Sequence, residues 1–297
     1  MSDRPFALSA PARNVIVLDV EQEAPGRPVE FLLRSDAHFD NPDSLSDLET
    51  KHLDQAIEQN ATILDLGDLF DVMEGKHDRR ASKHLRPEHT NGSYLNQVIG
   101  TAADRYEPYA RNWALLGMGN HEYSVAKHAE FDLTQQLSAT IHDRTGYAIH
   151  AGGFANWIVI RVHRKNHASY RTYRIYAHHG YGGGGVVTKG AIQGQRAAAR
   201  VEGADLYMSG HIHEAWHMER LKTCLDFRMR EVSKTVDQLC IPSYKEEFFE
   251  GKGRGFHHEK GRDPKPVGAW WLRLWLERHQ NEGEDLLRLH ATFERAK

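Results

Sequence analysis

The chain has 297 residues, with 38 lysines and arginines against 41 aspartates and glutamates, and a formal net charge of −3. This near balance gives no electrostatic argument for nucleic acid or a membrane surface as a partner, and no run approaches the ~18 apolar residues that a membrane-spanning helix needs. The two cysteines, Cys224 and Cys240, exclude a disulfide framework and a cysteine-based zinc site. We therefore expect a cytoplasmic protein that does not contact a membrane.

The N-terminal segment Met1–Arg13 has neither the basic start nor the long apolar stretch of a signal peptide. The charged loop Gly251–Pro266 is too short to mark a domain boundary. We expect a single domain over residues 1–297, because a chain of this length can bury a large core in one α/β unit.

In the first half of the chain, apolar runs and helical spacings alternate. Strands are predicted at Asn14–Val20, Val29–Leu33, Thr62–Leu64 and Trp113–Leu116, and helices at about Ser44–Glu58, Tyr94–Tyr109 and His128–Leu137. A polar turn, Glu21–Pro28, joins the first two strands, and Gly75–Gly92 is a very polar segment.

The second half contains more strands. Trp157–Arg164 and Tyr170–Ala177 are predicted to form a hairpin, followed by a helix at Gln193–Val201 and a strand at Leu206–Met208. Strand-like and loop-like pieces then alternate, and a closing hairpin is expected at about 268–294. The alternation of helices and strands indicates the α/β class.

Five of the apolar runs end in residue types that bind metals. The five segments that follow them are Asp36-Ala37-His38, Gly67-Asp68-Leu69-Phe70-Asp71, Gly119-Asn120-His121-Glu122, His178-His179-Gly180 and Gly210-His211-Ile212-His213. Because ligands of open α/β sheets bind outside the carboxyl ends of the strands, we expect these segments to form one site. Asp36 and His38 are two residues apart, as are His211 and His213, and strand alternation predicts that each pair points to one side.

The donor atoms of these segments are carboxylate, amide oxygen and imidazole, without thiolate. This mixture favours Mn, Fe, Zn, Co or Ni over Ca or Mg. About seven ligands are available, which exceeds the four of a structural zinc site. The set instead suits two ions that share one carboxylate, at a separation of about 3.5–4 Å.

The order D-x-H, G-D-x-x-D, G-N-H-E, H-G and G-H-x-H resembles the calcineurin-like metallophosphoesterases, and the core motifs span residues 31–213. The glycine run Gly182–Gly185 is similar to that of phage and bacterial members. The resemblance implies an α/β fold, an αββα sandwich of two mixed β-sheets flanked by helices. It also implies hydrolysis of a phosphomonoester or phosphodiester by a metal-bridging hydroxide at two divalent metal ions, of which manganese is the first candidate.

The resemblance also assigns roles to individual residues. Asp36, His38 and His213 match ligands of the first metal, Asp68 the bridging carboxylate, and Asn120 and His211 ligands of the second metal. The fourth segment offers His178 and His179. We favour His179, because in the H-G form of this motif the ligand directly precedes the glycine.

His121 is expected to act as the general acid, because imidazole titrates near neutrality and can protonate a departing alkoxide. The family pairs this histidine with the second aspartate of G-D-x-x-D, which is Asp71. A helix N-cap is the alternative role for Asp71. Glu122 is expected to be structural.

Several features bear on the substrate, which we expect to be a phosphate ester such as a nucleotide or a nucleic acid. Protein Ser/Thr phosphatases carry an arginine where this chain has Val72-Met73-Glu74, which disfavours phosphoproteins. A DNA-repair-type nuclease is the alternative function, and a catalytically inactive scaffold is a further one. A homodimer would be unsurprising. Basic residues that would grip phosphates, or form a solvated face, follow the second motif: Lys76, Arg79, Arg80, Lys83 and Arg86.

Overall fold

The computed structural model describes residues 3–72, 86–90, 93–167, 169–226, 228–246, 261, 263–281 and 284–296. Its strands are β1 (Phe6–Ala12), β2 (Val15–Gln22), β3 (Val29–Arg34), β4 (Thr62–Asp65), β5 (Trp113–Leu116), β6 (His150–Ala151), β7 (Ala155–Arg164), β8 (Tyr170–His178), β9 (Leu206–Ser209), β10 (Trp216–Leu225), β11 (Glu231–Cys240), β12 (Ala269–Asn281) and β13 (Glu284–Ala296). Its helices are α1 (Ser46–Glu58), α2 (Tyr94–Tyr106), α3 (Asn120–Ala129), α4 (Leu133–Thr145) and α5 (Ala191–Arg200), with 3₁₀ turns η1 (Pro87–His89) and η2 (Glu107–Tyr109).

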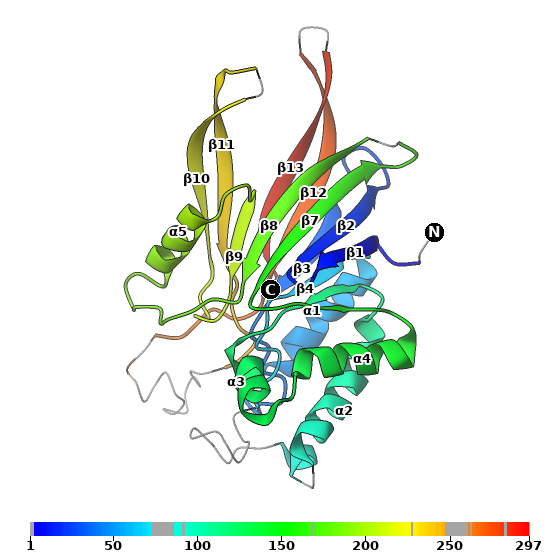
Figure 1. Cartoon of the computed structure of the whole chain (residues 1–297), viewed down its shortest axis with the longest axis vertical. Helices are drawn as coiled ribbons and strands as arrows, with labels where there is room; N and C mark the ends of the chain where they lie inside the picture. The colour runs from blue at the N-terminus through cyan, green and yellow to red at the C-terminus, as the bar shows by residue number, and fades with distance from the viewer. Residues whose placement is uncertain are drawn as a thin grey trace.

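Within these ranges the strands form two mixed sheets (Figure 1). Sheet A has the order β1-β2-β7-β8-β9-β11-β10, and sheet B has the order β13-β12-β3-β4-β5-β6. In sheet B the strands β3, β4, β5 and β6 are parallel, whereas β12 and β13 pair antiparallel. In sheet A the strands β8, β9 and β11 are parallel to one another.

The two sheets face each other across an apolar core, and strand alternation explains how β3 serves two cores. Phe31 and Leu33 point toward sheet A and pack with residues such as Ile160. Leu32 points the other way, into a second core shared with the helices. Because β3 is buried on both faces, its sequence is a continuous apolar run rather than an alternating one.

Helices cover the outer faces of both sheets. In α2, Val98, Ala102 and Tyr106 recur every four residues and pack into the core on the outer face of sheet B. On the other side of the molecule, Ala197 and Ala198 of α5 pack against Tyr207 of β9. The layers are therefore helix, sheet, sheet, helix, which confirms the expected αββα sandwich (Figure 1).

The two strands joined by the Glu21–Pro28 turn are present as expected, and they lie in different sheets, β2 in sheet A and β3 in sheet B. One local expectation differs from the structure. The helix expected at His128–Leu137 is instead the end of α3 and the beginning of α4. Glu130 interrupts the chain in a left-handed conformation (φ 54°), and Asp132 caps α4 by accepting a hydrogen bond from the Gln135 amide at 3.1 Å.

After the last motif, where strand-like and loop-like pieces were expected, the structure has a long antiparallel hairpin, β10–β11. The closing hairpin β12–β13 is present as expected and spans Ala269–Ala296. No helix in the described ranges is long and apolar enough to cross a membrane.

Candidate metal centre

The five motif segments lie at the carboxyl ends of β3, β4, β5, β8 and β9, so both sheets contribute to one site. Main-chain hydrogen bonds join the loops: the Asp36 amide donates to the Gly67 carbonyl at 2.9 Å, and the Gly210 amide donates to the His179 carbonyl at 2.8 Å. The His211 amide then donates to Asp36 Oδ2 at 2.9 Å, which ties a loop of sheet A to a loop of sheet B. Loops from both sheets therefore lie together, as expected for these segments.

Two motif glycines make this close approach feasible. A Cβ atom on Gly119 would lie 2.0 Å from Asp68 Oδ1, and a Cβ atom on Gly210 would lie 2.1 Å from Ser35 Oγ. Any larger residue would push these loops apart. The glycines are thus required by the packing of neighbouring loops against the carboxylates.

Strand alternation, which was expected to point the side chains of each pair to one side, does not explain their positions. β3 ends at Arg34 and β9 ends at Ser209, so the paired ligands follow the strands rather than lie in them. Of the eleven non-glycine residues with positive φ among those described, five belong to the cluster: Asp36, His38, Asp68, His211 and His213. Such strained backbone accumulates at functional sites, where the surrounding structure holds it in place.

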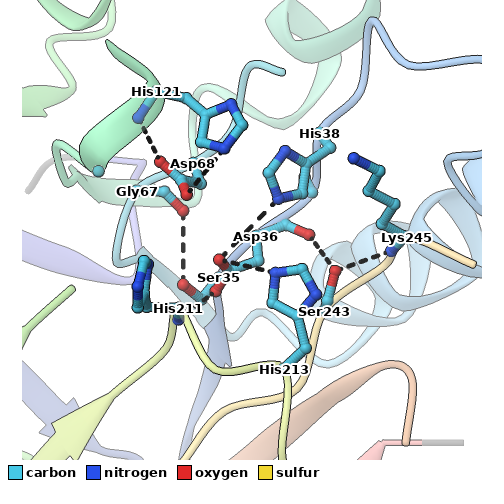
Figure 2. Close-up of polar contacts among 12 residues, drawn as sticks. Ser35, Asp36, His38, Gly67, Asp68, His121, His211, His213, Ser243 and Lys245 are labelled. Carbon is cyan, nitrogen blue, oxygen red and sulfur yellow. Dashed lines mark hydrogen bonds and ion pairs between the residues drawn. The ribbon is translucent and has the colours of Figure 1, made fainter. Parts of the chain in front are cut away.

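The side chains form overlapping groups whose nitrogen and oxygen atoms lie within 4.8 Å of one another (Figure 2). The first group is Asp36, His38 and His213, and His213 Nε2 is 3.4 Å from Asp36 Oδ1. The second group is Asp68, His179 and His211, and His179 Nε2 is 3.1 Å from Asp68 Oδ2.

Asp68 also belongs to a third group, with His38 and His121, and so connects the two ends of the cluster. Asn120, the first residue of α3, places its Oδ1 atom 3.2 Å from His179 Nε2. All seven residues predicted as metal ligands therefore lie together.

The structure separates the two histidines of the fourth motif. His179 is almost fully buried and points at Asp68. His178 is the last residue of β8, accepts a hydrogen bond from the Gly180 amide on Nδ1 at 2.9 Å and packs edge-on against Tyr181. The geometry favours His179 as the ligand, as the sequence did.

His121 lies at the edge of the cluster. Its main-chain amide donates to Asp68 Oδ1 at 2.9 Å, and its ring Nε2 is 3.8 Å from Asp68 Oδ2. Its Nδ1 atom lies 2.5 Å from the main-chain carbonyl oxygen of Asp71. The Asp71 carboxylate is farther away, at 3.8 Å from His121 Nδ1, and is closer to His38, at 2.9 Å from Nδ1 of that ring. The expected pairing of Asp71 with His121 is thus made mainly through the main chain.

Glu122 has a structural role, as expected. Its Oε2 atom accepts hydrogen bonds from the amides of Gly119 and Asp68, at 2.9 and 3.1 Å, and Oε1 accepts one from Phe70 at 3.0 Å. This fully buried carboxylate therefore joins the second and third motif loops.

Sequence reasoning missed the residues that surround Asp71. Asp40 Oδ1 accepts a hydrogen bond from the Asp71 amide at 2.6 Å, Asn41 Nδ2 donates to Asp71 Oδ2 at 2.7 Å, and Lys245 Nζ is 3.0 Å from Asp71 Oδ1. Asp40 and Asn41 follow the first motif after one residue, Phe39, and this proximity was the available signal. Lys245 lies in no motif.

The basic segment after the second motif is described only in part. Lys76, Arg79, Arg80 and Lys83 lie outside the described residues. The guanidinium group of Arg86 donates to the Asn41 carbonyl at 3.3 Å and to Ser46 Oγ at 3.0 Å, so it joins the loop after β3 to α1.

Two carboxylates of the cluster are held in the ionised form that binds cations. Burial raises the pKa of Asp36, but the neighbouring His213 and His179 outweigh this effect and hold the pKa at about 2. Burial also opposes ionisation of Asp68, yet His179 and His121 keep the pKa of this carboxyl well below its usual value. Both carboxylates are therefore ionised near neutral pH, in a place shielded from water.

The ligand atoms also fit a metal ion chemically. His38 Nε2 is buried, has no hydrogen-bond partner among the described residues and lies 4.0 Å from Asp36 Oδ1. A buried polar atom without a partner costs about 1–3 kcal/mol, and coordination of a cation would remove this cost. The mixture of imidazole, carboxylate and amide oxygen suits first-row divalent metals.

No family model and no curated protein matches the chain. Among solved structures, it is similar to the vacuolar protein sorting 29 protein of Cryptosporidium parvum. The identity is 10%, the match covers 90% of this chain and 99% of that chain, and the TM-score is 0.33. A likeness this weak carries no functional argument, so the function must be inferred from the residues of the site.

Proposed function

We propose that this protein is a dinuclear metal-dependent phosphoesterase of the calcineurin-like superfamily, which hydrolyses a phosphomonoester or phosphodiester. The observation that carries the proposal is that seven ligand side chains from five strand ends, Asp68 among them, lie in one cluster. A single structural ion would need four ligands. The group that contains Asp36 and the group that contains His179 are joined by a third, which contains His38 and Asp68, and this arrangement suits two neighbouring ions.

We assign Asp36, His38 and His213 to one ion, Asn120, His179 and His211 to the other, and Asp68 to both. When bound, two such ions would activate water and neutralise the charge that develops on the phosphate. Manganese is the metal we propose, with Fe, Zn, Co or Ni as alternatives. We also propose a cytoplasmic location, as expected from the sequence.

His121 is the proton donor in this proposal, and its surroundings support that role. Because a carbonyl oxygen can only accept, the 2.5 Å contact with the Asp71 carbonyl requires that His121 Nδ1 carries a proton. Nε2 then faces the cluster, 3.8 Å from Asp68 Oδ2. A proton on Nε2 is placed to pass to the leaving oxygen of the ester.

The test is hydrolysis of a chromogenic monoester and a chromogenic diester by the full chain, first stripped of metal and then loaded with manganese. We expect about two ions per chain and turnover that depends on them. Fewer than one ion per chain after loading would refute the proposal. Single- and double-stranded DNA are included in the assay, and cleavage of either at an efficiency comparable to the diester would identify the substrate as nucleic acid.

A further inference from the structure

Lys245 lies beside the metal centre, although no motif contains it. The segment that follows β11 is hydrogen-bonded to the main chain of Asp36. The Ser243 hydroxyl donates to the Asp36 carbonyl at 2.8 Å, and the Tyr244 amide donates to the same oxygen at 3.0 Å. The Lys245 amide in turn donates to Ser243 Oγ at 2.9 Å. These bonds fix the main chain of Lys245 next to the first ligand pair, and its side chain lies close to His38 (Figure 2).

The ammonium group of Lys245 binds the Asp71 carboxylate. Nζ is 3.0 Å from Asp71 Oδ1, and the two side chains are only 11% and 5% exposed. The other oxygen, Oδ2, accepts a hydrogen bond from Asn41 Nδ2 at 2.7 Å. The carboxylate is therefore held from both sides, and an ion pair this well buried is rigid compared with one at the surface.

The same oxygen, Asp71 Oδ1, contacts the metal-facing histidine. It lies 2.9 Å from His38 Nδ1. Because an ionised carboxylate can only accept, this contact favours a proton on His38 Nδ1, and Nε2, 4.0 Å from Asp36 Oδ1, would then keep its lone pair for a cation. This carboxylate–imidazole contact is the arrangement that orients metal-binding histidines and sets their tautomer.

We propose that Lys245 is a positioning residue: through Asp71 it fixes the orientation of His38 for the first metal ion. This inference rests on the proposed metal-dependent function and adds Asp71 as a support for a ligand, besides its main-chain contact with His121. Without Lys245, the carboxylate would lose the charge that holds Oδ1 in place, and the His38 ring would lose its fixed partner. A different role, direct contact of Lys245 with the substrate phosphate, makes the opposite prediction for metal binding.

The experiment is a calorimetric titration of manganese into the metal-free full chain, with Lys245→Met, Lys245→Arg and the wild type. We expect Lys245→Met to lower the affinity for one of the two ions about 10–100-fold, which is the usual effect of removing a residue that supports a ligand. Lys245→Arg keeps the charge and should recover most of the affinity. The control is Lys234→Met in β11, which removes a 2.8 Å ion pair with Asp205, the residue before β9. Neither residue belongs to the cluster, so this variant should bind both ions like the wild type.

Metal binding by the wild type tests the proposed function, and metal binding by Lys245→Met tests the positioning role. A wild type that binds no manganese refutes the proposed function itself. If the wild type binds two ions and Lys245→Met binds them equally well, the positioning role is refuted. A weaker inhibition by inorganic phosphate in that variant would then assign Lys245 to the substrate. Should Lys245→Met fail to fold by circular dichroism, Lys245→Gln replaces it, with the same expected loss of affinity.

Discussion

A fully buried arginine beneath the site gives the sharpest stability prediction. Arg34, the last residue of β3, is 0% exposed. Its Nε atom is 2.9 Å from Asp65 Oδ2, and its Nη2 atom is 2.5 Å from Glu49 Oε1. Both carboxylates are also 0% exposed. Arg105 shares Glu49 from the other side, with Nη2 2.6 Å from Oε2.

We expect Arg34→Met to destabilise the protein by about 3–5 kcal/mol at pH 8, the range for removing one partner of a buried ion pair. Methionine fills part of the volume, so the loss is mainly electrostatic. Glu49 keeps Arg105, whereas Asp65 has no second ion pair among the described residues and keeps the Gly67 amide, which donates to Oδ1 at 2.9 Å. Removing Arg34 therefore destabilises the ionised form of Asp65 more than that of Glu49.

The loss should depend on pH, and its sign follows from Asp65. Burial raises the pKa of Asp65 to about 7, although Arg34 opposes this shift. A carboxyl whose pKa is raised by folding favours the folded state when protonated, and this contribution is lost as pH rises through the folded pKa. Removing Arg34 raises that pKa further, so the loss of stability should be constant below about pH 7, where Asp65 is protonated in both folded proteins. It should then grow by about 1.4 kcal/mol between pH 7 and pH 8, where only the wild type releases this proton.

The assay is urea unfolding of the wild type and of Arg34→Met at pH 5 and pH 8, compared at equal m-values. The control is Arg144→Met, which removes an exposed arginine 2.7 Å from Asp104 and should leave the midpoint nearly unchanged. A loss below about 1 kcal/mol at pH 8 would refute the reasoning, since unpaired buried charges cost more than that. So would a loss of equal size at both pH values.

The remaining predictions concern the metal centre. Asp68→Asn should abolish manganese binding and hydrolysis together, because one carboxylate serves both proposed ions; retention of two ions by calorimetry would contradict this. His121→Ala should keep both ions and slow turnover about 10²–10⁴-fold, less for an ester whose leaving group needs no proton, and loss of metal would show that the role is misassigned. Gly119→Ala should lower manganese affinity, because its Cβ atom would lie 2.0 Å from Asp68 Oδ1, whereas Gly183→Ala, with no atom within 4 Å of its Cβ, should behave like the wild type.

The elements that could be located from sequence are the strands that are buried on both faces. Strands β3, β4 and β5 are buried on both faces, and their continuous apolar runs fixed their positions to within about a residue. The hairpin β10–β11 was missed because most of β10 is exposed at an edge of sheet A, and its residues show no apolar pattern. The break between α3 and α4 was missed because Glu130 adopts a left-handed conformation that its residue type does not favour.

Whether a residue of the site could be predicted from sequence depends on how far along the chain its contacts lie. The seven residues proposed as ligands could be predicted to lie together because each strand end carries its own short motif, and strand ends of an α/β sheet meet at one edge. Their orientation could not, because it depends on left-handed backbone at Asp36 and His211 rather than on strand alternation. The role proposed for Lys245 could not be predicted from sequence, because it depends on a contact with Asp71, 174 residues earlier in the chain. Residues that bind a ligand directly leave a local pattern, whereas residues that hold those ligands in place are recognised only from the folded contacts.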